Sequence, residues 1–319
     1  MLFAYSRDHS GLKRLAADAP PKEAIWIDLL RPSIEESAEI DALGLMVPSL
    51  AEMEEIEISN RLYREEGADY MTVVLPGLSE TQTQISGPVT FILTQTRLVT
   101  VRHHAPRPFE TYPDRADKAT AGCTTPERVF LGLIEDIVAR LADLLEGSGR
   151  ALDDVMRAAF GGTATQDPSV LQTALETTGR QGELLGRVRL SLLTLERALS
   201  FFGQTLATRT EGDALGALVK GQTADMQALE VHVDFLSSRI SLAVDATLGM
   251  INLAQNVTVR IVSVVAALFL PPTLIASMYG MNFTGMPELQ WHYGYAYALV
   301  LMLASAVGTY LFFKRKRWL

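Results

Sequence analysis

"IVSVVAALFLPPTLIASMYGMNFTGMPELQWHYGYAYALVLMLASAVGTYLFFKRKRWL", residues 261–319, holds two uncharged apolar runs that are separated by a short polar link. The first run covers residues 261–279 and the second covers residues 293–313. Each is about as long as a helix that crosses a hydrocarbon core of ~30 Å. The stretch therefore predicts two membrane helices, about 258–279 and 293–313, joined by an outer loop over residues 280–292.

Basic residues flank these runs on one side of the predicted membrane only. Arg260 precedes the first run, the link has no Lys or Arg, and a basic tail covers residues 314–319. The positive-inside rule places both basic ends in the cytoplasm, so we expect the N- and C-termini to be cytoplasmic. The initial residues also lack the apolar segment of a signal peptide. The tail residues are expected to bind lipid head groups: Lys314, Arg315, Lys316 and Arg317.

Composition agrees with a cytoplasmic body. The chain has a formal net charge of −9 and a single cysteine, Cys123. An acidic surface repels nucleic acid, and one cysteine cannot form an intrachain disulfide or a zinc-thiolate cluster. We therefore expect a protein of a reducing compartment with no nucleic-acid partner.

Residues 1–125 read as an α/β domain. Residues 24–30 and 69–79 are strand-like, and residues 88–104 predict a hairpin that turns at Gln95 and Thr96. Ser33 and Glu36 form the pattern of a capping box at a helix start. His103 and His104 are neighbours on a strand and point to opposite faces, so a surface or strand-end role is expected instead of a shared metal.

Four glutamates, Glu52, Glu54, Glu55 and Glu57, lie in a predicted helix over residues 52–66. Such a run is most often a solvated helix face, and the alternative is a divalent-cation site, because hard cations prefer carboxylate oxygens.

Residues 126–257 predict a helical hairpin and stalk. One helix is expected from about Ser169 to Ala207, and a longer one from about Asp213 has no clear stop before Tyr279. Such a helix would be roughly 100 Å long at 1.5 Å per residue.

Two stripes run along this longer helix. One has the heptad-like spacing of a packing seam: Leu229, Val233, Leu236, Ile240, Ala243, Thr247, Met250, Ala254, Val257 and Ile261. The other mixes an acid, amides and small or aliphatic residues: Asp245, Leu248, Asn252, Asn256, Val259, Val262, Ala266, Leu270, Thr273 and Ser277. Polar groups on one face of a membrane helix should face protein or water.

The order of these elements resembles the CorA family of divalent-cation transporters. The family signature Gly280-Met281-Asn282 stands at the outer end of the first of two C-terminal spans, within "FLPPTLIASMYGMNFTGMPEL", and "KRKRWL" comes after the second. The detailed resemblance covers residues 230–319, while the α/β domain and the hairpin agree in architecture.

The resemblance implies a homopentameric funnel whose first spans line one pore. Gly280, Met281 and Asn282 would form a selectivity filter at the outer mouth, and Asn282 and Asp245 would interact with the ion. Glu288 would gather cations in the outer loop or anchor that loop. Leu270 stands where family members often have Met. The expected pore-lining residues are Asn252, Asn256, Val259, Val262, Leu270, Thr273 and Ser277.

The function that this resemblance implies is passive uptake of Mg²⁺, with Co²⁺ or Ni²⁺ as further ions, across the plasma (inner) membrane. Mg²⁺ would be both the transported and the regulatory ion, and no organic cofactor is expected. No nucleotide-binding glycine loop or catalytic constellation is present, so an enzyme is not expected. Two alternatives stay open: a proton-coupled Zn²⁺ transporter similar to the ZntB branch, and a membrane-anchored regulatory protein that does not conduct.

Overall fold

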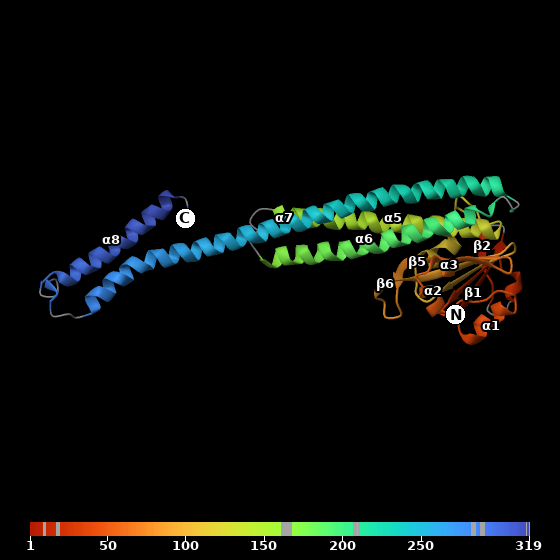
Figure 1. The fold of residues 1–319 in the computed structure, drawn as a ribbon, viewed down its shortest axis with the longest axis horizontal. Coiled ribbons are helices and arrows are strands. Elements are labelled where there is room, and N and C mark those ends of the chain that lie inside the picture. The colour runs from red at the N-terminus through yellow and green to blue at the C-terminus, as the bar shows by residue number, and fades with distance from the viewer. Residues whose placement is uncertain are drawn as a thin grey trace. The chain divides into compact units, whose positions relative to one another are not determined.

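The computed structural model describes residues 1–319 except 9–10, 17–19, 161–167, 207–208, 210, 282–284, 288–290, 317 and 319 (Figure 1). The described chain divides into two compact units. The first comprises Met1–Met156 and Glu176–Ala243, and the second comprises Arg157–Leu175 and Val244–Leu319.

A seven-stranded mixed sheet forms the centre of the first unit, in the order β2-β1-β3-β7-β6-β5-β4. Only β3 and β7 are paired in parallel, and the expected antiparallel hairpin of β6 and β7 is confirmed. The strands are β1 Leu2–Asp8, β2 Gly11–Arg14, β3 Trp26–Leu30, β4 Leu62–Glu65, β5 Ala68–Leu78, β6 Gln84–Leu93 and β7 Leu98–Arg102.

Helices cover both faces of the sheet. Successive side chains of a strand point to opposite faces, so they pack in two different cores. Phe91 packs in one core with α5 (Pro126–Phe160), α6 (Pro168–Gly203) and α7 (Gly212–Gly280). Its neighbour Ile92 packs in the other core with Ile40 of α1 (Ile34–Asp41) and Met53 of α2 (Leu50–Glu54). The short elements are η1 Pro21–Glu23, α3 Ile58–Arg61, α4 Pro108–Thr111 and η2 Tyr112–Asp114.

The capping box at the start of α1 is confirmed: the Glu36 N–H donates to Ser33 Oγ, and the Ser33 N–H donates to Glu36 Oε2. A second box, formed by Ser49 and Glu52, begins α2.

The prediction of one helix over residues 52–66 is wrong. Helix α2 ends at Glu54, since Glu55 adopts an extended backbone with φ −56° and ψ 137°. After the single turn of α3 the chain becomes β4, in which Tyr63 pairs with Tyr70 of β5 and their rings stack at 4.6 Å. Cross-strand pairing at the sheet edge therefore outweighs the helix propensity of the glutamates.

Helix α7 has 69 residues and, as expected, continues without interruption from Gly212 to Gly280. The predicted packing seam is confirmed from Val233 to Thr247, where Val233, Leu236, Ala243 and Thr247 are buried, whereas Ile261 at its far end is 57% exposed. Helix α8 (Gly294–Arg315) comes next, and α7 and α8 are both long and apolar enough to cross a membrane.

Candidate functional site

The second stripe of α7 is exposed along its described length. Asp245 and the seven expected pore-lining residues are all exposed in the single chain. The exposed fractions are 63% for Val259, 63% for Val262 and 66% for Leu270. Most of the surface of these three side chains is therefore left uncovered by the described chain.

The polar side chains of the stripe fall into two groups. The Thr273 hydroxyl donates to the carbonyl oxygen of Phe269 at 2.6 Å, so it is satisfied within the helix. Within the described residues, Asn252 and Asn256 form no hydrogen bond through their side chains. Both residues precede the predicted span, which begins at about residue 258, so water at the inner end of the helix can satisfy their amides.

Two consecutive prolines, Pro271 and Pro272, lie inside α7. Proline has no N–H, so the carbonyl oxygens of Ala267 and Leu268 lose their usual helical donors. The two missing hydrogen bonds lie beside the part of the stripe between Leu270 and Thr273. A helix bends most readily at such a point.

The structure describes only two of the three signature residues at the outer end of α7. Gly280 is the last residue of the helix, and Met281 comes directly after it with 57% of its surface exposed. Asn282 and Glu288, expected at the filter and in the outer loop, lie outside the described residues, as does Arg317 of the tail.

Helix α8 carries different chemistry at its two ends. Lys314, Arg315 and Lys316 are exposed at the C-terminal end, while Tyr293, Tyr295 and Tyr297 are exposed around the start. Tyr and Trp gather at membrane–water interfaces, and basic residues bind head groups. The 22 residues of α8 rise about 33 Å, which matches the thickness of a bilayer core. The aromatic end was missed by sequence analysis, although the spacing of its tyrosines carried the signal.

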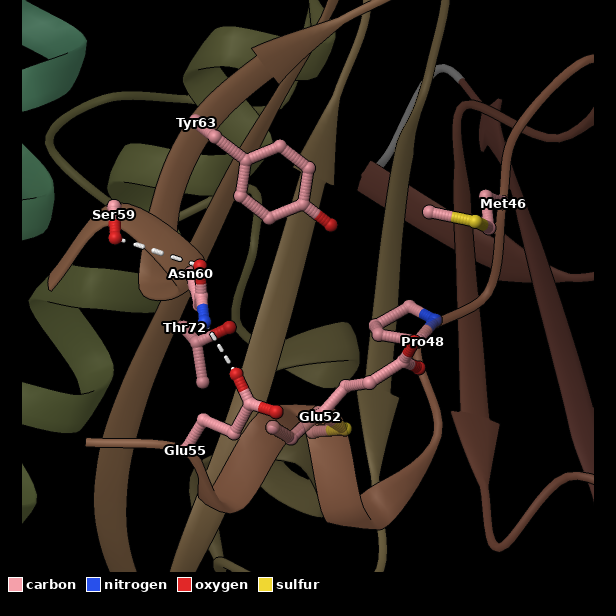
Figure 2. A pocket seen from close by; sticks show the side chains of 9 residues that line it. Met46, Pro48, Glu52, Glu55, Ser59, Asn60, Tyr63 and Thr72 are labelled. Carbon is pink, nitrogen blue, oxygen red and sulfur yellow. Dashed lines mark hydrogen bonds between the residues drawn. The ribbon is translucent and has the colours of Figure 1, made fainter. Parts of the chain in front are cut away.

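The acidic run borders a cavity of about 330 Å³ in the α/β domain (Figure 2). Glu52 accepts hydrogen bonds from the Ser49 N–H and hydroxyl, both at 2.8 Å, and these bonds lower its pKa. Glu55 accepts from the Asn60 amide. Burial, with Tyr70, Glu65 and Glu52 nearby, raises the pKa of Tyr63 to about 12. All four glutamates of the run are exposed, which agrees with the solvated interpretation.

Of the two roles expected for His104, the surface role is wrong, while a position at the strand end is confirmed, since β7 ends at Arg102. His104 is 2% exposed, and its Nε2 lies 2.9 Å from the carbonyl oxygen of Leu75, which requires Nε2 to carry the proton. A Cβ at Gly77 would lie 2.7 Å from the His104 ring, and one at Gly87 would lie 2.8 Å from it. Burial lowers the pKa of His104 to about 4, so the side chain is neutral. The glycines within β5 and β6 were the sequence signal for this packing.

Two buried charge clusters were also missed by sequence analysis. Asp28 of β3 accepts hydrogen bonds from Arg102 of β7, with Nη2–Oδ2 at 2.8 Å, and from Thr100 at 2.8 Å. Asp69 of β5 binds both Arg64 and Arg209. A single sequence gives no indication of which charges will meet inside a fold.

Comparison with known proteins gives one consistent family. The family described as "CorA-like Mg2+ transporter protein" matches residues 21–315. The magnesium transport protein CorA of Haemophilus influenzae is 33% identical over 322 residues, which cover 100% of both chains.

Solved structures give the same fold. The CorA magnesium transporter from Methanocaldococcus jannaschii matches with a TM-score of 0.70 at 17% identity, covering 100% of this chain and 99% of that one. The ZntB cytoplasmic domain from Vibrio parahaemolyticus matches with a TM-score of 0.56 at 10% identity, covering 77% of this chain and 96% of that one. At these identities the structural likeness concerns the fold alone.

Proposed function

Because this chain belongs to the CorA family of divalent-cation transporters, and so is a multi-pass protein of the inner membrane, we propose that it is a Mg²⁺ channel. Uptake runs into the cytoplasm through a pore shared by five copies of the chain. The observation that carries this proposal is the exposed stripe of α7 within the predicted span, which includes Val262, Thr273 and Ser277.

The stripe supports a shared pore because one chain cannot enclose an ion path with a single helix face. Within the predicted span the stripe carries the hydroxyls of Thr273 and Ser277, while other faces of α7 expose large apolar side chains such as Phe269 and Leu274. Lipid suits the apolar faces, and water or protein suits the polar stripe. A ring of α7 helices with the stripe inward satisfies both requirements, with Val259, Thr273 and Ser277 also lining the path.

Asn282 forms the filter of the proposed channel at the outer mouth, beside Gly280 and Met281. Mg²⁺ gives up its water reluctantly, so a ring of amide oxygens selects it by accepting hydrogen bonds from a hydrated ion. Val262 and Leu270 form apolar constrictions that close the path by excluding water. Asp245 attracts the cation near the inner end, and Glu288 does so in the outer loop.

The membrane potential supplies the driving force. One charge gains about 2.3 kcal/mol per 100 mV, so a divalent ion gains about 4.6 kcal/mol on entry. Binding of Mg²⁺ to the cytoplasmic domains closes the pore when the internal concentration is high, and loss of this ion opens it.

Ion flux into liposomes that hold the purified protein tests the proposal. Mg²⁺, Co²⁺, Ni²⁺ and Zn²⁺ are compared under an imposed potential, with and without a pH gradient. Asn282→Ala is expected to lower Mg²⁺ entry at least tenfold, while Gln227→Ala, an amide of α7 that binds Glu196 at 3.4 Å outside the stripe, retains it.

The same experiment separates the alternatives. Zinc entry that requires the proton gradient would indicate the ZntB-like function. Absence of flux for every ion and condition would favour a regulatory anchor.

A further inference from the structure

Asp69 of β5 is a buried carboxylate that binds two arginines. Its exposed fraction is 1%, and its Oδ1 accepts from Arg64 Nε at 2.7 Å. Its Oδ2 accepts from Arg209 Nη2 at 2.6 Å. Arg209 is only 10% exposed, and its Nη1 donates to Glu127 of α5 at 2.7 Å. Two carboxylates and two guanidinium groups thus form a neutral cluster of charge-assisted hydrogen bonds.

Arg209 joins three parts of the first unit. It lies in the connection between α6 and α7, shortly before α7 begins at Gly212. Next to it, Arg128 of α5 donates to Glu211 of the same connection at 2.7 Å. The first turn of α5 and the start of α7 are therefore linked by two ion pairs of opposite polarity, and Arg209 extends this link to the sheet through Asp69.

Among the described residues, Asp69–Arg209 is the one ion pair between the sheet and the connection before α7. Arg64 binds the same carboxylate but lies on β4, at the edge of the sheet, with 49% of its side chain exposed. The two arginines thus have equivalent chemistry and different positions. Of the two, Arg209 alone lies in the connection that leads into α7, where it adds a directional contact to the apolar core that the sheet and α7 share.

A charged joint differs from an apolar contact in one respect. Apolar packing resists separation but tolerates sliding, whereas a buried guanidinium with three partners holds one orientation. Arg209 has that number, since its Nε also donates to Thr205 Oγ1 at 3.2 Å. Such a joint suits a helix that must move with the domain at its base.

We propose that Arg209 is a positioning residue for gating: through Asp69 it fixes the base of α7 to the α/β domain, so that the domain's response to cytoplasmic Mg²⁺ reaches the pore helix. The inference rests on the proposed function. It predicts that breaking the joint uncouples inhibition by internal Mg²⁺ from conduction while the pore itself stays intact.

The test is Mg²⁺ flux into liposomes loaded with graded internal Mg²⁺, for wild type, Asp69→Asn, Arg209→Lys and the matched control Arg64→Gln. Lys keeps the positive charge of Arg209. Its single ammonium group cannot replace the two guanidinium nitrogens that donate to Asp69 and Glu127. For Asp69→Asn and Arg209→Lys the half-inhibitory internal Mg²⁺ should rise at least fivefold. Flux at zero internal Mg²⁺ should stay within twofold of wild type, and Arg64→Gln should match wild type in both quantities.

Circular dichroism and size-exclusion chromatography of each variant accompany the flux. The inference is overturned if Asp69→Asn and Arg209→Lys fold and keep the wild-type midpoint, or if Arg64→Gln shifts it equally. If Asp69→Asn does not fold, Arg209→Lys decides alone, and failure of both to fold means a structural role and also overturns it. If the wild-type protein shows no Mg²⁺ flux, or if internal Mg²⁺ does not inhibit that flux, the proposed function is refuted. The role of Arg209 in gating is then refuted with it.

Discussion

The two halves of α7 have the same secondary structure and different surroundings. In residues 212–243, Leu215, Met226, Val233 and Leu236 are each 1% exposed, because the half packs on α5 and α6. In residues 244–280, Val259, Val262, Phe269 and Leu270 are each more than half exposed. The first half is thus stabilised by its own chain, and the second exposes apolar side chains that its own chain leaves uncovered. Substitutions should therefore lower stability in the first half and change transport in the second.

The largest expected loss of stability comes from the buried ion pair in the sheet. Arg102 and Asp28 are 3% and 1% exposed, so Arg102→Leu leaves an uncompensated carboxylate. We expect unfolding free energy to fall by about 3–5 kcal/mol in chemical denaturation of the detergent-solubilised protein. Arg150→Gln, which removes a pair with Glu146 at 70% and 67% exposure, should cost at most about 1 kcal/mol. If both variants lost a similar amount of unfolding free energy, the difference in burial between the two ion pairs would be contradicted.

Two leucines, one in each half of α7, test the difference between the two halves. Leu236→Ala opens a cavity in the first unit and should cost about 2–5 kcal/mol of unfolding free energy. Leu248 is 45% exposed and lies on the stripe, so Leu248→Ala should cost about 0.5 kcal/mol or less and instead alter Mg²⁺ flux. Equal destabilisation would show that both halves depend on packing within the chain.

Acid should weaken the sheet through His104. Burial, followed by the charges of Arg102, His103 and Arg31, lowers the pKa of His104 from 6.5 to about 4. Between these values the unfolded chain binds a proton that the folded chain does not, so stability is complete above pH 6.5 and falls as the pH falls. The loss should reach about 3 kcal/mol near pH 4. Denaturation of His104→Gln across this range should show a smaller slope, and an unchanged slope would exclude His104 as its source.

The effect that is smallest for each residue concerns the tail. Replacing Lys314, Arg315 and Lys316 by Gln removes about 1 kcal/mol of attraction to anionic lipid per residue. We expect weaker stabilisation of the variant by anionic than by neutral lipid in thermal unfolding. The triple variant Lys13→Gln, Lys22→Gln and Lys118→Gln, in the first unit, is the matched control. Equal responses of the two would contradict head-group binding.

Features that depend on local periodicity were predicted correctly from the sequence. The two apolar runs, the alternating strands, the capping box of Ser33 and Glu36 and the seam of α7 depend on spacing alone, and each is present. The segment after Glu54 was wrongly predicted, because its conformation is decided by pairing with β5. Buried His104 and the Asp69 cluster were missed, since both depend on residues far apart in the sequence.

The candidate site was predicted in a different way. The stripe of α7 came from helical spacing, and its inward orientation stays a prediction, because residues of other faces such as Val265 and Leu274 are also exposed in the single chain. The roles of its residues came from resemblance to a family, because the spacing of residues along a helix does not identify the ion that an amide side chain binds. Asn282, on which selectivity is proposed to depend, lies outside the described residues.

Cysteine accessibility tests the inward orientation of the stripe most directly. The chain has one cysteine, Cys123, which is buried, so Cys123→Ala gives a background without reactive thiols. Single cysteines at Val259, Val262, Leu270 and Thr273 are compared with cysteines at Val265, Phe269 and Leu274 for block of Mg²⁺ flux by a charged thiol reagent. We predict block at the four stripe positions, slowed by Mg²⁺, and little effect at the other three. Block at Val265, Phe269 and Leu274 with none along the stripe would contradict the pore assigned to α7.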